Sequence, residues 1–198
     1  MVVYLIRHGM TAGNQKKRYI GTTDESLCPD GIQELQKVKK LQLYPVPDIL
    51  YTSPMKRCRE TAELLFPGKD RKEVADFREC DFGEFENKNY MELSGNLHYQ
   101  QWIDSNGQLP FPEGESREGF QKRNVQAFQR LEKEWMQGDL DDKIIAIVAH
   151  GGTIMSILQA VGQPEGTYYD FHVGNGEGYR LEGKSGRYFY HKLNFEKN

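Results

Sequence analysis

The chain has 198 residues, of which 37% are hydrophobic, and this length and composition fit one globular domain with a sizeable core. The formal net charge of -3 at pH 7 argues against nucleic acid or an anionic membrane as the main partner, because both require a broad basic surface. The longest apolar run, residues 144–149, is far shorter than the ~20 residues of a membrane-spanning helix. We expect no export of the protein, because the N-terminal residues run straight into a strand-like segment with no charged region and no small-residue cleavage site.

The N-terminal apolar run predicts a buried parallel strand that ends abruptly in Arg7-His8-Gly9. Such a strand delivers these side chains to the carboxyl edge of a sheet, where open α/β folds place their ligand sites. A phosphoryl group suits this trio, because neutral imidazole is a nucleophile, guanidinium binds phosphate oxygens and glycine permits close approach of the backbone. Thr11 and Asn14 add hydrogen-bond donors nearby.

A polar loop is expected over residues 12–30, followed by an amphipathic helix. Apolar residues at helical spacing identify this helix: Ile32, Leu35, Val38 and Leu41. Residues 48–52 then have the composition of a second strand. Ser53 and Pro54 follow as the expected N-cap and first residue of a helix that runs to about Phe66.

The middle of the chain is less regular. Residues 74–77 predict a third, short strand, and the acidic run at 78–86 predicts a loop. Residues 87–115 form a weakly patterned insert with turn-prone sequences, which we interpret as a lid over the substrate. Ser116 is expected to cap a long amphipathic helix that extends through Trp135.

Residues 143–149 predict a strand that is buried on both faces, because they are almost continuously apolar. This strand ends in His150 and two glycines, so it repeats the strand-to-helix junction at the N-terminus. A helix is expected over residues 153–161. Beyond residue 167, aromatic residues alternate with polar ones across the turn at 183–186, which predicts a β-hairpin.

The alternation of these elements indicates an α/β protein, a three-layer αβα sandwich with a mainly parallel central sheet and a C-terminal β-hairpin. We expect one domain, residues 1–198, with the insert at about 87–115 covering the substrate.

Two histidines, two arginines and an acidic loop can meet at one edge of this sheet, and this combination suits phosphoryl transfer. His8 would attack phosphorus to give a phosphohistidine, while Arg7, Arg57 and His150 hold the phosphoryl oxygens. Glu79 is the expected general acid for the leaving alkoxide, and would then deprotonate water in the second half-reaction. This charge balance requires no metal and no cofactor.

Other residues compete for these roles. Asp81, Glu84 and Glu86 share the acidic loop with Glu79, and a solvated loop is the plain interpretation of each. The remaining histidines are His98, His172 and His191. They lack metal-ligand spacing and are expected to be surface or sheet residues, although His172 could face the site.

The three cysteines are widely spaced and form no CxxC pair. A reduced, cytoplasmic setting is therefore expected for Cys28, Cys58 and Cys80. A cysteine phosphatase needs an arginine six positions beyond its cysteine, and no arginine occupies any of these three positions.

Four segments occur in the order of one family's motifs. They are Arg7-His8-Gly9-Met10-Thr11-Ala12-Gly13-Asn14, Ser53-Pro54-Met55-Lys56-Arg57-Cys58-Arg59-Glu60-Thr61-Ala62, Phe77-Arg78-Glu79-Cys80-Asp81-Phe82-Gly83-Glu84 and Ala149-His150-Gly151-Gly152. The chain therefore resembles the histidine phosphatase superfamily, in the branch that includes cofactor-dependent phosphoglycerate mutases. Where that family often has a threonine helix cap, this chain has Cys28, so Asp30 or the turn at Pro29 is expected to compensate.

The resemblance implies that His8 is phosphorylated, that Arg7, Arg57 and His150 form the phosphate pocket, and that Glu79 is the proton donor. It also implies substrate contacts from a second set of residues: Thr11, Asn14, Gly21, Thr22 and Gly151.

The short chain and residues 111–116 look like the phosphatase branch, and residues 18–27 are similar to a loop of α-ribazole phosphatases. The expected activity is hydrolysis of a small phosphate ester, with α-ribazole 5′-phosphate of cobalamin biosynthesis as the candidate substrate. A phosphoglycerate mutase and a noncatalytic phosphate-binding domain stay open as alternatives, as does a homodimer.

Overall fold

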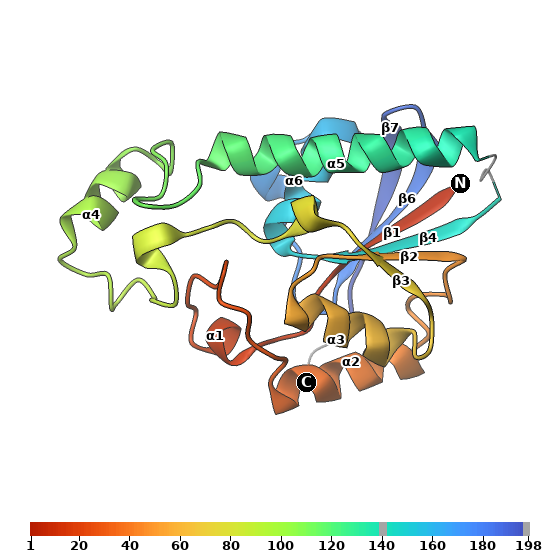
Figure 1. The fold of residues 1–198 in the computed structure, drawn as a ribbon, viewed down its shortest axis with the longest axis horizontal. Helices are drawn as coiled ribbons and strands as arrows, with labels where there is room; N and C mark the ends of the chain where they lie inside the picture. Colours follow the sequence, from red (N-terminus) through yellow and green to blue (C-terminus); the bar gives the residue numbers. More distant parts are fainter. Residues whose placement is uncertain (139–141, 196–198) are drawn as a thin grey trace.

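A computed structural model describes residues 1–138 and 142–195. Its centre is a mixed sheet in the order β3-β2-β4-β1-β6-β7-β5 (Figure 1). The strands are β1 Val2–Arg7, β2 Ile49–Thr52, β3 Arg71–Glu73, β4 Ile144–Ala149, β5 Gly162–Gln163, β6 Gly178–Lys184 and β7 Arg187–Leu193. Neighbouring strands from β3 to β1 are parallel, whereas β6 runs antiparallel to both β1 and β7. The predicted α/β class, mainly parallel sheet and C-terminal hairpin are confirmed.

Helices cover both faces of this sheet. They are α1 Ala12–Gln15, α2 Pro29–Lys40, α3 Lys56–Leu65, α4 Leu97–Asp104, α5 Arg117–Gln137 and α6 Gly151–Val161. Helices α2 and α3 lie below the sheet in Figure 1, α5 and α6 lie above it, and α4 stands apart at one end. None of the helices in the described part of the chain combines the length and apolar character needed to cross a bilayer.

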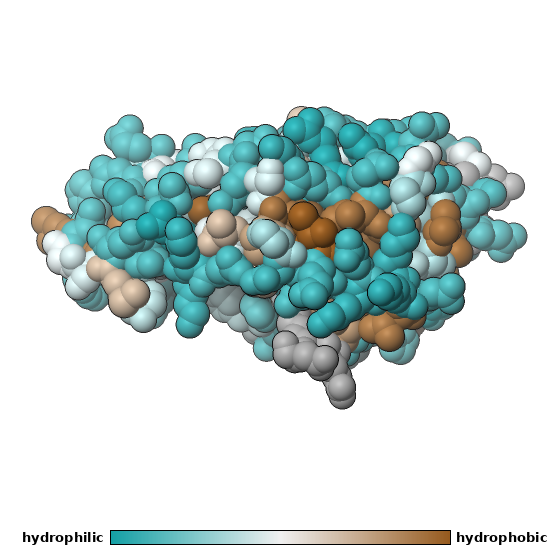
Figure 2. All heavy atoms as spheres, turned by 90° about the horizontal axis from the view of Figure 1, so that it is seen from below, coloured by the Kyte–Doolittle hydropathy of each residue, from teal (hydrophilic) through white to brown (hydrophobic). Residues whose placement is uncertain are grey.

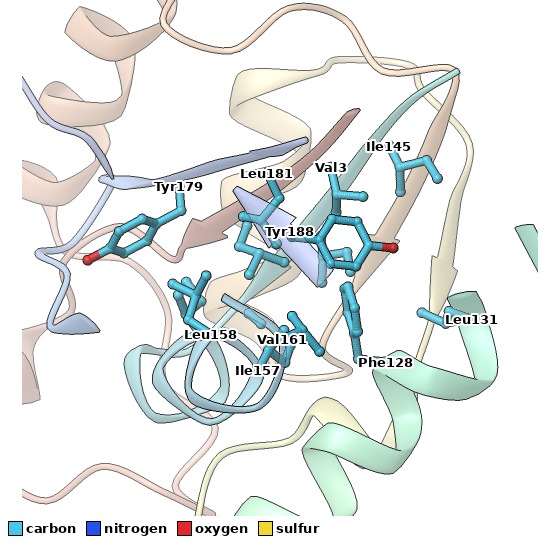
Figure 3. Packing of buried hydrophobic residues seen from close by; sticks show 14 of the residues in the cluster. Val3, Phe128, Leu131, Ile145, Ile157, Leu158, Val161, Tyr179, Leu181 and Tyr188 are labelled. Atoms are coloured by element: carbon cyan, nitrogen blue, oxygen red, sulfur yellow. The ribbon is translucent and has the colours of Figure 1, made fainter. Parts of the chain in front are cut away.

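The alternation of side chains along β1 explains the three layers. Val3 and Leu5 point to one face of the sheet and pack in the core with α5 and α6, whereas Tyr4 and Ile6 belong to the core under α2 and α3. Both faces are buried, so the strand is apolar throughout. Figure 3 shows the upper core, where Phe128 of α5 packs with strand and α6 residues.

Helix α2 begins where Pro29 occupies the first helical position. The sequence predicts that Asp30 or the turn at Pro29 compensates for a missing threonine cap, but the Cys28 thiol itself is the cap, with its sulfur accepting a hydrogen bond from the Gly31 N–H at 3.4 Å. The helix is amphipathic, and Leu35 and Val38 are fully buried against the sheet. Viewed from below, the molecule is mainly hydrophilic with an apolar patch near the middle of this face (Figure 2).

The prediction of a strand at residues 74–77 is wrong. The edge strand β3 lies just before it, at Arg71–Glu73, and Ala75–Phe77 form a short 3-10 helix. All three β3 residues are polar and exposed, as is usual for a protected sheet edge, so apolar patterning does not reveal them. Phe77 is apolar because it packs in the core with residues of α5.

The prediction that Ser53 caps the next helix is also wrong. Helix α3 begins at Lys56, with Met55 at the N-cap position and no side-chain cap. Ser53 follows β2 directly, and its hydroxyl bonds the His150 ring instead. By contrast, the prediction for Ser116 is confirmed, since its Oγ accepts a hydrogen bond from the Gly119 N–H at the start of α5.

The loop over residues 12–30 and the insert both contain helices that the sequence pattern missed. Helix α1 lies in the first, and α4 lies in the second with Asn96 as its cap. Helix α4 is amphipathic only weakly, because its aromatic residues join a cluster outside the main core. This cluster combines residues of the insert with residues of two other loop regions and of α5: Tyr19, Cys80, Phe82, Phe85, Leu93, Tyr99, Trp102, Phe111 and Phe120.

Candidate active site

The two motif histidines meet because their strands are neighbours. β1 and β4 are parallel, with Arg7 opposite Ala149 in the register, so His8 and His150 both leave the same edge of the sheet. Their ring centroids lie 5.2 Å apart, with the ring planes inclined at 66°. The two imidazoles thus contact each other edge to face at the carboxyl ends of the strands.

His8 is buried and its geometry favours one tautomer. The Nδ1 atom lies 2.7 Å from the Gly9 carbonyl oxygen, so Nδ1–H donates and Nε2 keeps its lone pair. Burial lowers the pKa of His8 well below 6.5, and the positive charges of Arg57 and Arg7 lower it further. The ring is therefore neutral at ordinary pH, and its Nε2 lone pair is free of the proton.

His150 occupies the N-cap position of α6 and is fully buried. Its Nε2 is 2.8 Å from Ser53 Oγ, and its Nδ1 is 3.7 Å from Glu79 Oε2. Burial lowers the pKa of His150 well below 6.5, with Arg57 contributing next, so the unliganded ring is neutral. An arriving phosphoryl dianion would favour its protonated form, because an opposite charge raises a histidine pKa.

Cys58 lies beside His150, with its sulfur 3.6 Å from Nε2. Burial raises the pKa of this thiol to about 12, so the side chain is uncharged. Cys28, Cys58 and Cys80 are all buried free thiols. The uncharged Cys58 thiol beside His150 argues against a cysteine nucleophile at this position.

Arg57 projects from the first turn of α3 and is completely buried. Three backbone carbonyls of the loop after α1 hold its guanidinium: Nη1 donates to Thr23 at 3.0 Å, and Nη2 donates to Gly21 at 3.1 Å and to Ile20 at 3.3 Å. Its buried Nε–H has no hydrogen-bond partner among the described residues.

The Arg7 guanidinium is also held by a backbone carbonyl. Its Nη1 donates to the Val173 carbonyl at 2.7 Å, while its buried Nε–H also lacks a partner in the described ranges. A Cβ atom at Gly151 would lie 3.4 Å from this Nε, so the glycine keeps the space beside the guanidinium open. Two fixed cations thus each present one unused buried donor near His8.

Glu79 reaches the same space from the acidic loop, and its side chain is only 14% exposed. Burial raises the pKa of this carboxyl group, although a hydrogen bond from the Cys80 N–H and the charges of Arg57 and Arg7 partly oppose the shift. A carboxyl group with a raised pKa next to a nucleophile is suited to give a proton and later to take one back.

Arg123 of α5 supports the Glu79 loop, and the sequence patterns gave no sign of it. Its guanidinium donates to the backbone carbonyls of Asp76, Arg78 and Glu79 at 2.6, 2.8 and 3.0 Å. A bidentate pair with Glu115, at 2.7 and 2.8 Å, fixes the same group from the other side. Arg123 is therefore a positioning residue for the Glu79 backbone.

If Glu79 protonates the leaving oxygen of alkyl phosphates, as the sequence motifs predict, replacing Arg123 by Gln should slow their hydrolysis about 10- to 100-fold, because a displaced Glu79 would reach that oxygen less well. A general acid loses its proton as pH rises through its pKa, so the pH at which the rate begins to fall should move upward in this variant, since the Arg123 charge lowers the pKa of Glu79. Steady-state kinetics across pH measure both effects. Arg123→Lys keeps the positive charge but not the planar group, so it should restore the wild-type pH profile more fully than the wild-type rate.

Arg130→Gln is the matched control, because Arg130 lies on the same helix and pairs with the Asp76 carboxylate at the surface. We expect this variant to keep the rate and pH profile of the parent. Equal losses in both arginine variants would show a general effect on α5 and contradict the positioning role.

The remaining predicted contact residues have other partners. Thr11 and Asn14 form the capping box of α1, and Asn14 Oδ1 also accepts a hydrogen bond from Asn175 at 3.1 Å. The N–H of Gly21 donates to Glu86 Oε1 at 2.8 Å, while the side chain of Thr22 is exposed. The structure thus brings the five predicted catalytic side chains and Gly151 together, whereas Thr11 and Asn14 stabilise the start of α1 and Gly21 and Thr22 lie in the loop after it.

The competing acids are engaged elsewhere. Glu86 Oε1 accepts from two backbone N–H groups of the loop after α1, and Asp81 Oδ1 accepts from the Gly83 N–H. Glu84 pairs with the exposed His98 at 2.8 Å. His172 and His191 are exposed, and no group of three or more metal-ligating side chains occurs within residues 1–138 and 142–195.

Comparison with models of protein families shows to which family the chain belongs. Residues 3–196 match the model of the histidine phosphatase superfamily, branch 1. The chain belongs to this superfamily. The match spans nearly the whole sequence and includes all four motifs, so the resemblance noted from the motifs is confirmed.

Relatives within the superfamily carry different activities. The chain is 26% identical over 182 residues to an adenosylcobalamin/alpha-ribazole phosphatase of Salmonella typhimurium, covering 89% of this chain and 87% of the relative. It is 29% identical over 167 residues to a 2,3-bisphosphoglycerate-dependent phosphoglycerate mutase of Gloeobacter violaceus, covering 79% and 74%. A solved phosphoserine phosphatase variant of Entamoeba histolytica, in complex with phosphoserine, superposes with a TM-score of 0.77 at 27% identity, covering 97% and 96%. The family therefore includes phosphatases and mutases of small phosphorylated molecules.

Proposed function

We propose that this protein is a metal-independent phosphomonoesterase that forms a phosphohistidine at Nε2 of His8. One observation carries the proposal: the neutral His8 ring lies close to two guanidinium groups whose buried Nε–H donors have no partner in the described residues. An unpaired buried donor is unfavourable, and phosphoryl oxygens are strong acceptors that match guanidinium geometry. A phosphate ester would satisfy both donors at once.

The reaction proceeds in two half-reactions. In the first, the Nε2 lone pair of His8 attacks phosphorus, the bond to the ester oxygen breaks, and the Glu79 carboxyl group protonates the leaving alkoxide. In the second, the Glu79 carboxylate takes a proton from water, the resulting hydroxide attacks phosphorus, and the bond to His8 breaks. Arg7, Arg57 and His150 stabilise the phosphoryl charge in both steps.

The N-terminus of α6 adds to this electrostatic stabilisation. His150 is the N-cap residue and has no side-chain capping bond, so backbone N–H groups at the start of the helix point toward the site. The helix dipole favours a bound anion at this end. This gives Gly151 a role as a backbone donor to the phosphoryl group.

For the substrate, we propose α-ribazole 5′-phosphate, with residues 87–115 forming part of the cover over it. The support is the similarity to an alpha-ribazole phosphatase along most of both chains, together with the similar loop at residues 18–27. We also propose a cytoplasmic location for the protein, because its three cysteines are free thiols. Phosphoglycerate mutase activity is the alternative.

A phosphate-release screen tests the proposal. Purified protein in excess EDTA is assayed with α-ribazole 5′-phosphate, phosphoserine, 3-phosphoglycerate, sugar phosphates and nucleotides. We expect release of inorganic phosphate, fastest from α-ribazole 5′-phosphate, with no gain on adding divalent metal. Rapid isomerisation of 3-phosphoglycerate primed with 2,3-bisphosphoglycerate, without phosphate release, would overturn the phosphatase assignment.

A further inference from the structure

A cavity of about 300 Å³ has Glu79 among its lining residues. Its volume lies at the lower end of the range for small-molecule sites. Residues from six separate segments line it, and most are aromatic: Tyr19, Phe82, Trp102, Phe111, Phe120, Tyr168 and Tyr169. Since Glu79 must reach the oxygen that leaves, the group attached to that oxygen would extend into this cavity.

The aromatic wall is ordered by ring-to-ring contacts. Trp102 stacks on Phe111 with centroids 5.1 Å apart, and Phe111 meets Phe82 edge-on at 5.0 Å. Gly107 faces the Trp102 ring, where an added Cβ atom would come within 3.2 Å of the indole. The turn thus approaches the ring closely and fixes one side of the wall. A flat, apolar wall of this kind binds a flat, apolar ligand most favourably.

One cation lies at the same cavity. The Arg117 guanidinium carbon is 4.8 Å from the Tyr168 ring centroid and 5.0 Å from that of Tyr169. Among residues 1–138 and 142–195, no carboxylate forms a salt bridge with Arg117, unlike Arg123 one helical turn and a half further along. Its donors are therefore available to a ligand, and the two tyrosine rings limit where the group can point.

We propose that this cavity is a leaving-group subsite that selects alcohols carrying an aromatic or heteroaromatic ring with a hydrogen-bond acceptor or anionic substituent. The ring packs on Trp102 and Phe111, and Arg117 binds the substituent. This inference rests on the phosphatase function proposed above, because it assigns the group that leaves His8. Small polar alcohols, such as serine and glycerate, would leave the aromatic wall uncovered and gain little from it.

The test compares phosphate esters whose alcohols have similar basicity, so that the chemical step is alike. 2-Phenylethyl phosphate provides the ring, and n-butyl phosphate lacks it. We expect the wild-type protein to favour the aromatic ester about 10-fold or more in kcat/KM. Trp102→Leu should remove most of this preference while changing kcat/KM for n-butyl phosphate less than about threefold.

Tyr90→Leu is the matched control, because Tyr90 is an aromatic residue of the same insert that is 58% exposed and lies outside this cavity. A second variant addresses the cation without removing a packed ring. Arg117→Gln should lower kcat/KM for 2-(4-carboxyphenyl)ethyl phosphate about 10-fold, and that for 2-phenylethyl phosphate much less. Circular dichroism and thermal melting check that each variant is folded.

The outcomes separate the subsite from the catalytic proposal. If the wild type hydrolyses the aromatic and butyl esters equally well, the subsite is overturned and the phosphatase function stands. If it hydrolyses neither ester nor any other phosphate, the catalytic proposal is contradicted. In that case calorimetric titration of His8→Ala protein with both esters tests the subsite alone, and equal affinities would overturn it.

Discussion

His8→Ala should reduce hydrolysis of every phosphate ester by about 10⁴-fold or more, because it removes the Nε2 lone pair that the proposed mechanism uses to attack phosphorus. The second histidine cannot replace it, since its Nε2 is bonded to the Ser53 hydroxyl. Steady-state phosphate release measures the rate. Rapid quenching at alkaline pH, followed by mass spectrometry, should find an acid-labile phosphoryl group on His8 of the wild type and none on the variant.

His191→Ala is the control for this experiment, because His191 is an exposed residue of β7. This variant should keep full activity and the same phosphoryl group. Unchanged turnover in His8→Ala protein would refute the phosphohistidine mechanism. Phosphorylation of a different residue in the wild type would refute it as well.

Glu79→Gln should divide substrates by their leaving groups. Alkyl phosphates need a proton on the departing oxygen, so their kcat/KM should fall about 10²- to 10⁴-fold. p-Nitrophenyl phosphate leaves as a stabilised phenolate and should lose less than about 10-fold. Assaying both esters with both proteins at one pH provides the comparison. Equal losses on the two esters would count against Glu79 as the acid.

The pH dependence of the same variant has a definite sign. Burial raises the pKa of Glu79 above its ordinary value of 4.5, so kcat/KM for alkyl phosphates should decline as pH rises through the raised pKa. This limb should be absent in Glu79→Gln protein, where only the titration of the substrate phosphate persists. An unchanged limb in the variant would assign it to another group.

Stability should follow the same linkage. The folded protein holds the Glu79 proton more tightly than the unfolded chain, so its contribution is complete below the unfolded pKa and is lost as pH rises through the folded pKa. Glu79→Gln cannot lose this proton. The difference in melting temperature, variant minus wild type, should therefore become more positive as the pH is raised from acidic to mildly alkaline. Calorimetry measures both melting temperatures.

The sequence by itself determined the fold class and the positions of the buried strands. β1 and β4 are apolar on both faces because helices cover both sides, and such runs are recognisable without a structure. The strand-end motifs also located His8 and His150, since parallel neighbours deliver their carboxyl ends to one edge. Local capping was readable at Ser116, where the side chain bonds its own helix.

Only the tertiary structure decided features that depend on partners distant along the chain. β3 is polar because it is an exposed edge, so hydrophobic patterning placed it three residues late. Ser53 carries the signature of a helix cap, yet its hydroxyl bonds a histidine 97 positions away. Arg123 supports Glu79 through backbone carbonyls, which leave no trace in side-chain patterns. The raised pKa of Glu79 and lowered pKa of His8 likewise arise from burial among these elements, which no single segment contains.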